Sequence, residues 1–112
     1  MNETKIGRSL FIQAREWFDK SGGNSYFSAT ITVDGNEIAV LPFQYGYGDH
    51  YLSMAGRKLV ELGYITPEQD KGSLYSLARA NGFDFYSGKK ETLKRNMFAQ
   101  GKYYQEVRAS SN

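Results

Sequence analysis

Tyr26-Phe27-Ser28-Ala29-Thr30-Ile31-Thr32-Val33-Asp34-Gly35 is the clearest structural signal in the chain. Apolar and polar side chains alternate along it, which is the two-residue period of a strand with one buried face. Asp-Gly then predicts a two-residue type I′ turn, because that turn needs positive φ at both central positions. The turn sets the register of a hairpin. It places Ile31 opposite Ile38, Ala29 opposite Val40 and Phe27 opposite Pro42.

The polar face of the first of these strands carries Tyr26, Ser28, Thr30 and Thr32. If no helix covers this face, it is a tyrosine-bearing platform suited to contact with another protein. If it faces only water, these side chains are simply solvated.

The segments before and after the hairpin carry signals of helices. Before it, apolar residues at i, i+1, i+4, i+7 and i+8 predict a helix over residues 9–20 with Trp17 in the core. After it, Asp49 and Gly63 bracket a second helix, and Thr66-Pro67-Glu68-Gln69 forms a capping box before a third over residues 73–80. A fourth helix is expected over residues 89–100.

We therefore expect an α+β domain in which an antiparallel β-hairpin packs against about four helices, in the order α-β-β-α-α-α. A third strand, at residues 83–86 or 103–107, would extend the hairpin. The 112 residues fit a single domain, 1–112, since this length is typical of one hydrophobic core.

Composition excludes several classes of function. The chain has no cysteine and one histidine, which rules out thiol chemistry and multi-histidine metal centres. Its carboxylates do not cluster in sequence. No apolar run is long enough for a membrane span, and the N-terminus lacks a signal sequence. We expect a cytoplasmic protein that is not an enzyme and that holds no cofactor or metal.

The segment Tyr45-Gly46-Tyr47-Gly48-Asp49-His50-Tyr51 is the most unusual in the chain. Tyrosine is a preferred hot-spot residue, so Tyr45, Tyr47, His50 and Tyr51 are predicted protein contacts. Two alternatives remain. The glycines could merely permit a tight turn whose tyrosines cover the core, or the loop could hold a small ligand or nucleotide at the following helix N-terminus.

Charge is unevenly distributed. Residues 1–70 carry six Lys/Arg and nine Asp/Glu, whereas residues 71–112 carry eight and three. The basic group predicted on the last helix is Lys89, Lys90, Lys94, Arg95 and Lys102. These side chains offer phosphate contacts for nucleic acid as an alternative function, or they form a solvated helix face.

Three stretches carry a resemblance: Asn24-Ser25-Tyr26-Phe27-Ser28-Ala29, Val33-Asp34-Gly35 and Pro42-Phe43-Gln44 followed by the Tyr-Gly segment. Over residues 24–51 the chain resembles small bacteriophage and prophage proteins. The resemblance implies a non-enzymatic protein that binds a host protein, such as an inhibitor of CRISPR–Cas or of another antiviral defence. No site residue is implied by it.

Overall fold

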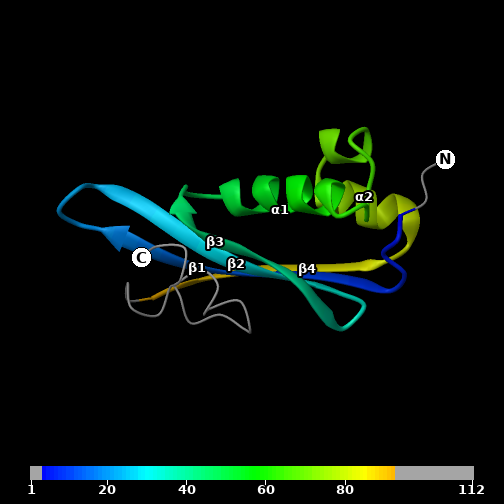
Figure 1. Ribbon diagram of the computed structural model, residues 1–112, viewed down its shortest axis with the longest axis horizontal. Helices are drawn as coiled ribbons and strands as arrows, with labels where there is room; N and C mark the ends of the chain where they lie inside the picture. The colour runs from blue at the N-terminus through cyan, green and yellow to red at the C-terminus, as the bar shows by residue number, and fades with distance from the viewer. Residues whose placement is uncertain (1–3, 93–112) are drawn as a thin grey trace.

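The computed structural model describes residues 4–92. Seven elements follow one another there: β1 (Ser9–Asp19), β2 (Asn24–Val33), β3 (Asn36–Tyr45), α1 (His50–Glu61), the 3-10 helix η1 (Gln69–Lys71), α2 (Leu74–Asn81) and β4 (Asp84–Glu91). The strands form one sheet in the order β3-β2-β1-β4, in which β4 runs parallel to β1 and the other pairs are antiparallel. Both α-helices lie on the same face of the sheet (Figure 1).

The β2–β3 hairpin is confirmed, with Asp34 at φ 50° and Gly35 at φ 85° in its turn. The predicted register is wrong: Ile31 pairs with Ala39, Ala29 with Leu41 and Phe27 with Gln44. The ladder is irregular between Ile31 and Thr32 and again between Phe27 and Ala29, so β3 shifts against β2. The shift keeps the apolar faces matched, because Ala39 and Leu41 are the buried residues of β3.

The helix predicted over residues 9–20 is wrong, because this segment is the strand β1. Its apolar residues fit the spacing of a helix, but Leu10, Ile12 and Ala14 also alternate, and these three side chains are fully buried. As a central strand, β1 forms ladders with both β2 and β4. This long-range pairing outweighs the local pattern. Trp17 is not in the core but half-buried.

The predicted order α-β-β-α-α-α and the count of four helices are therefore wrong. The described part of the chain is a small α+β fold with a four-stranded mixed sheet and two α-helices. The strand expected at residues 83–86 exists and continues to Glu91 as β4, so no helix begins at Lys89. The rest of the expected last helix and the strand at residues 103–107 lie outside the described residues.

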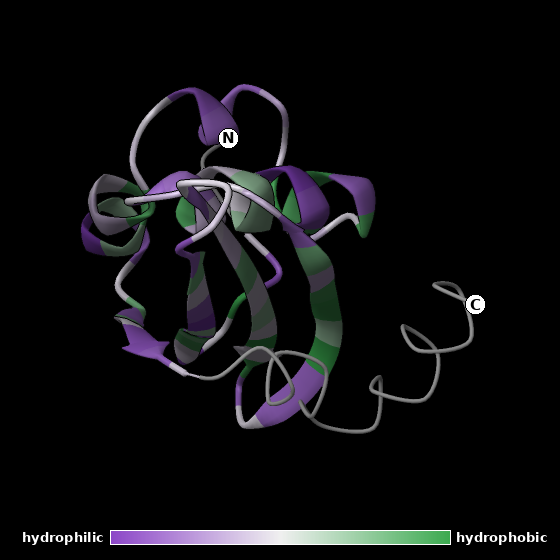
Figure 2. Ribbon diagram, turned by 90° about the vertical axis from the view of Figure 1, so that its left-hand side faces the viewer, coloured by the Kyte–Doolittle hydropathy of each residue, from purple (hydrophilic) through white to green (hydrophobic). Residues whose placement is uncertain are grey.

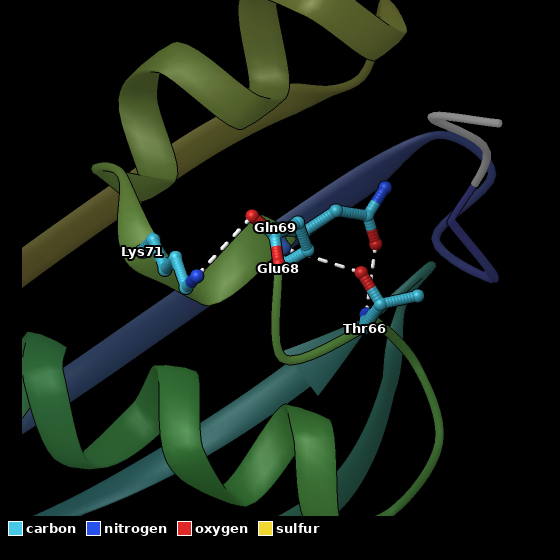
Figure 3. A network of polar contacts seen from close by, with 4 residues as sticks. All are labelled: Thr66, Glu68, Gln69 and Lys71. Atoms are coloured by element: carbon cyan, nitrogen blue, oxygen red, sulfur yellow. Dashed lines mark hydrogen bonds and ion pairs between the residues drawn. The ribbon is translucent and has the colours of Figure 1, made fainter.

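The two predicted middle helices are confirmed. Thr66 and Gln69 form the expected capping box: Thr66 Oγ1 accepts from the Gln69 N–H at 3.1 Å, and Gln69 Oε1 accepts from the Thr66 N–H at 2.8 Å (Figure 3). This box is followed by η1, which has only three residues and whose N-cap is Glu68. The Ser73 hydroxyl caps α2 by accepting from the Ser76 N–H at 3.0 Å.

One hydrophobic core fills the space between the sheet and the helices. Hydrophilic and hydrophobic residues alternate along the strands beneath α1 (Figure 2). The core-facing residues include Leu10, Ile12, Phe27, Ile31, Leu41, Ala55, Leu59, Leu74 and Leu77. Neither α-helix in residues 4–92 has the length and apolar character of a membrane span.

Candidate functional site

The second face of the sheet is covered by no element of residues 4–92 (Figure 1). We call it the open face. Strand alternation and register place these residues on it: Phe11, Gln13, Arg15 and Trp17 from β1; Tyr26, Ser28, Thr30 and Thr32 from β2; Glu37, Val40, Phe43 and Tyr45 from β3; Tyr86, Gly88 and Lys90 from β4. The polar strand face recognised in the sequence is part of it, and no described helix covers that face.

Four aromatic side chains from three strands meet at one end of the open face. This aromatic cluster consists of Trp17, Tyr26, Phe43 and Tyr45. The Tyr26 ring stacks on Trp17 at 5.6 Å and on Phe43 at 5.1 Å, and Tyr45 meets it edge-on at 6.0 Å. Trp17 and Phe43 are 6.3 Å apart, so the rings form a closed group. Mutual packing restricts the rotamers of these side chains.

A second aromatic group lies on the β1–β4 side of the open face. Phe11 and Tyr86 are opposite each other in the parallel ladder, with ring centroids 6.3 Å apart and planes at 81°. They remain 41 % and 58 % exposed. Because Phe11 and Trp17 are six residues apart on one strand, the two groups are separated by about 20 Å.

The two neighbouring lysines of β4 have different surroundings. Lys90 lies on the open face opposite Arg15. Lys89 lies on the helix side, where its ammonium group donates to the Gly48 carbonyl at 2.9 Å and pairs with Glu16 at 3.3 Å. It also sits 5.9 Å from the Tyr51 ring centroid. Lys89 thus ties β4 to β1 and to the Tyr-Gly segment.

The structure does not bring the four predicted contact residues together on one surface. Tyr45 ends β3 and is 56 % exposed within the aromatic cluster, and Tyr47 is 68 % exposed beyond it. His50 is exposed at the start of α1, with its ring edge-on to Phe27 at 5.8 Å. Tyr51 is 5 % exposed and packs in the core, so its side chain is structural.

Two glycines shape the connection from β3 to α1. A Cβ at Gly46 would lie 2.6 Å from Phe27 Cε2 and 2.7 Å from His50 Cδ2, so any side chain there would force these rings to shift. Gly48 has φ 60°, which disfavours a side chain. Asp49, the expected N-cap, makes no side-chain cap hydrogen bond. The glycines therefore permit a tight turn that carries Tyr45 and Tyr47 outward and Tyr51 inward.

Two carboxyl groups have shifted pKa values. Hydrogen bonds from the N–H groups of Arg8, Ser9 and Gly7 hold the pKa of Asp34 below its ordinary value. Burial raises the pKa of Asp70, and Arg57 partly opposes this. Neither residue lies among those of the open face. Within residues 4–92, no three His, Asp or Glu side chains converge as metal ligands.

Most of the open-face aromatics were not predicted as site residues. The helical spacing of residues 9–20 obscures Phe11 and Trp17 as residues of a sheet face, and Tyr86 is expected only within a short third strand. The useful signal was the alternation of residues 26–32, which marks a strand with a second face. Of the predicted basic group, Lys94, Arg95 and Lys102 lie outside the described residues.

Comparison of the chain with protein-family models, with curated proteins and with solved structures finds no match.

Proposed function

We propose that this chain is a non-enzymatic protein that binds another protein through the open face of its sheet. The observation that carries the proposal is the aromatic cluster, which gathers rings from three strands on a face with no described element over it. Tyr45 belongs to the cluster, and the exposed Tyr47 follows it in the chain as a further contact.

Aromatic side chains supply large contact areas at a small cost in conformational entropy. Trp17, Tyr26 and Phe43 are already held by one another, so this cost is reduced further. Their strands form the middle and one edge of the sheet, which gives the contact surface a rigid base.

The charge of the described residues favours a protein over nucleic acid as the partner. Residues 4–92 carry ten Lys/Arg and ten Asp/Glu. Nucleic-acid binding rests on several phosphate contacts, and on the open face only Arg15 and Lys90 among the described residues supply cations. The resemblance to phage proteins supports a bacterial host protein, including a component of an antiviral defence, as the partner.

The proposal is tested by affinity capture from bacterial lysate, with and without nuclease treatment, using the full chain and two matched variants. Tyr45 and Tyr75 are 56 % and 54 % exposed, but Tyr75 lies on α2, on the helix side of the sheet. We expect Tyr45→Ala to capture at least about tenfold less of a specific protein than the unaltered chain does, because truncation of a hot-spot residue weakens binding by this much. Tyr75→Ala should retain it.

Circular dichroism is used as a control that both variants are folded. Equal capture by Tyr45→Ala and the unaltered chain would overturn the proposal, and so would disappearance of the captured protein on nuclease treatment.

A further inference from the structure

We infer that two copies of this chain pair through the outer edge of β4, antiparallel and about a twofold axis at Gly88. This pairing concerns the edge of the sheet and does not depend on what the open face binds. Three features carry it: the backbone groups that β4 presents, the contrast between the two edges of the sheet, and the register that a twofold axis imposes.

β4 is an edge strand with a regular row of backbone hydrogen-bonding groups. It is the last strand of the sheet, and its ladder with β1 is unbroken. At the two ends of this ladder, the Asp84 N–H donates to Arg8 at 2.9 Å and the Thr92 N–H donates to Glu16 at 2.8 Å. Successive residues of a strand turn their N–H and C=O groups to opposite sides, so every second residue between these two points away from β1. These outward-facing residues are Phe85, Ser87, Lys89 and Glu91.

Side chains of the outward-facing residues hold this edge in place from the helix side. The Phe85 ring lies edge-on to Tyr75, with 4.6 Å between the ring centroids, and the hydroxyl oxygens of Tyr75 and Ser87 are 3.1 Å apart. The Lys89 ammonium group pairs with Glu16. The edge is thus ordered before it receives a strand, which reduces the entropy lost on binding.

β3, the opposite edge of the sheet, is poorly suited to receive a strand. Pro42 lies within β3 and has no N–H to donate. The Pro42 carbonyl already accepts from the Gln44 side-chain amide at 3.0 Å. The ladder between β2 and β3 also shifts its register at two places, which makes this edge irregular. Of the two edges formed by residues 4–92, β4 is therefore the one on which a further strand fits.

A second copy is the occupant that we assign, because β4 is complementary to itself about Gly88. An axis there places Ser87 opposite Lys89 of the second copy and Phe85 opposite Glu91 of the second copy, and symmetry repeats both pairs. Each of these pairs exchanges two hydrogen bonds, as in any antiparallel ladder, so all outward-facing groups of β4 are used. An axis at Ser87 leaves Glu91 without a partner in β4. An axis at Lys89 leaves out Phe85 and places two lysines opposite each other.

Gly88 lets the two backbones meet at the axis without side chains between them. A Cβ at this position would meet nothing within 4 Å inside one copy. On the open face, Tyr86 then lies opposite Lys90 of the second copy, and no like charges lie directly opposite one another in this register. An axis perpendicular to the sheet turns both open faces to the same side, so the dimer presents one continuous sheet with twice the open face.

The test is sedimentation velocity of the full chain from about 5 μM to about 500 μM, because dimer formation depends on concentration. We expect the unaltered chain to pass from monomer to dimer over this range. Gly88→Glu or Gly88→Lys alone places like charges opposite each other at the axis, and should raise the dissociation constant at least about tenfold. An equal mixture of the two variants should dimerise again. Gly72→Glu is the matched control, since a Cβ at Gly72 also meets nothing within 4 Å, and it should dimerise as the unaltered chain does.

An unaltered chain that stays monomeric over the whole range would overturn the inference. Dimers of Gly88→Glu and of Gly88→Lys as stable as the unaltered dimer would also overturn it, because the contact would then lie elsewhere. Neither result concerns capture of another protein by the open face, so the proposed function would stand.

Amide hydrogen exchange of the unaltered chain, followed by NMR, tests the same edge without a variant that has to fold. The amides of the outward-facing residues should exchange at least about tenfold more slowly at the highest concentration than at the lowest. Equal rates at both concentrations would contradict the pairing. Slow exchange at both would assign the edge to residues 93–112 of the same chain instead.

Discussion

Asp34 shows how one side chain joins two distant segments. It occupies the β2–β3 turn at φ 50°, and its carboxylate accepts N–H groups from Gly7, Arg8 and Ser9 at the start of β1. The sequence predicts the turn from Asp-Gly. It does not predict the three bonds, because they depend on where β1 begins.

Asp34 makes the stability of the folded chain depend on pH. Its pKa is lowered in the folded chain, so its stabilising effect is present above the unfolded pKa and is lost as pH falls through the folded value. We expect the urea midpoint to fall between about pH 5 and pH 3 more steeply for the unaltered chain than for Asp34→Asn. Asparagine retains the positive φ.

Asp49→Asn is the matched control, because the Asp49 side chain makes no cap hydrogen bond. If Asp34→Asn and Asp49→Asn have the same urea midpoint at every pH, Asp34 does not stabilise the start of β1.

Gly46 lies where the backbone between β3 and α1 passes close to two rings, which leaves no room for a Cβ. A Cβ there would press on both Phe27 and His50. We expect Gly46→Ala to lower the free energy of unfolding by about 1–3 kcal/mol, the usual cost of overpacking. Gly72→Ala, where a Cβ meets nothing within 4 Å and φ is −99°, should change it by less than about 0.5 kcal/mol. Equal urea midpoints for the two variants would contradict this packing.

At the scale of elements, the local signals succeeded where they were unambiguous. The Asp-Gly turn and the capping box at Thr66 depend on neighbours within three residues, and each forms as expected. The segment 9–20 is different, because its apolar residues satisfy both a helical and a strand period. Its state is decided by β2 and β4, and β4 pairs with it from more than 70 residues away.

The capping bond of α2 gives an element-scale prediction. The Ser73 hydroxyl accepts from the Ser76 N–H, and α2 has only eight residues. We expect Ser73→Ala to cost about 1 kcal/mol of stability in urea unfolding. Ser53→Ala, on an exposed position inside α1, should be neutral or slightly stabilising, since alanine favours helix. A neutral result for Ser73→Ala would mean that the cap does not stabilise α2.

Lys89 and Lys90 are neighbours on β4, but only Lys89 contacts β1 and the segment before α1. Lys89→Met removes the contacts with Glu16 and the Gly48 carbonyl and leaves the carboxylate, 16 % exposed, without this cation. We expect a loss of about 1–3 kcal/mol in the free energy of unfolding. Lys90→Met, one residue along on the open face, should be within about 0.5 kcal/mol of the unaltered chain. Equal losses for both variants would refute this division of roles.

At the scale of the whole molecule, the layers explain why the site was only partly predictable. The Tyr-Gly segment stands out in sequence, and Tyr45 and Tyr47 are indeed exposed. Trp17, Tyr26 and Phe43 are far apart in sequence and meet only because β1, β2 and β3 lie side by side. If residues 9–20 are taken as a helix, Trp17 is assigned to the core, and no strand brings its side chain beside Tyr26.

We propose that the open face, and not the helical face, binds a protein. The most direct measurement is site-specific photocrosslinking in living bacteria with benzoylphenylalanine placed at Tyr45, Tyr86, Tyr75 or Leu62 of the full chain. All four positions are between 43 % and 58 % exposed. Tyr45 and Tyr86 lie on the open face, Tyr75 lies on α2, and Leu62 is the C-cap residue of α1. We predict one common crosslinked protein from Tyr45 and Tyr86 and none from Tyr75 or Leu62. The same protein crosslinked from Tyr75 or Leu62, with none from Tyr45 and Tyr86, would contradict the claim.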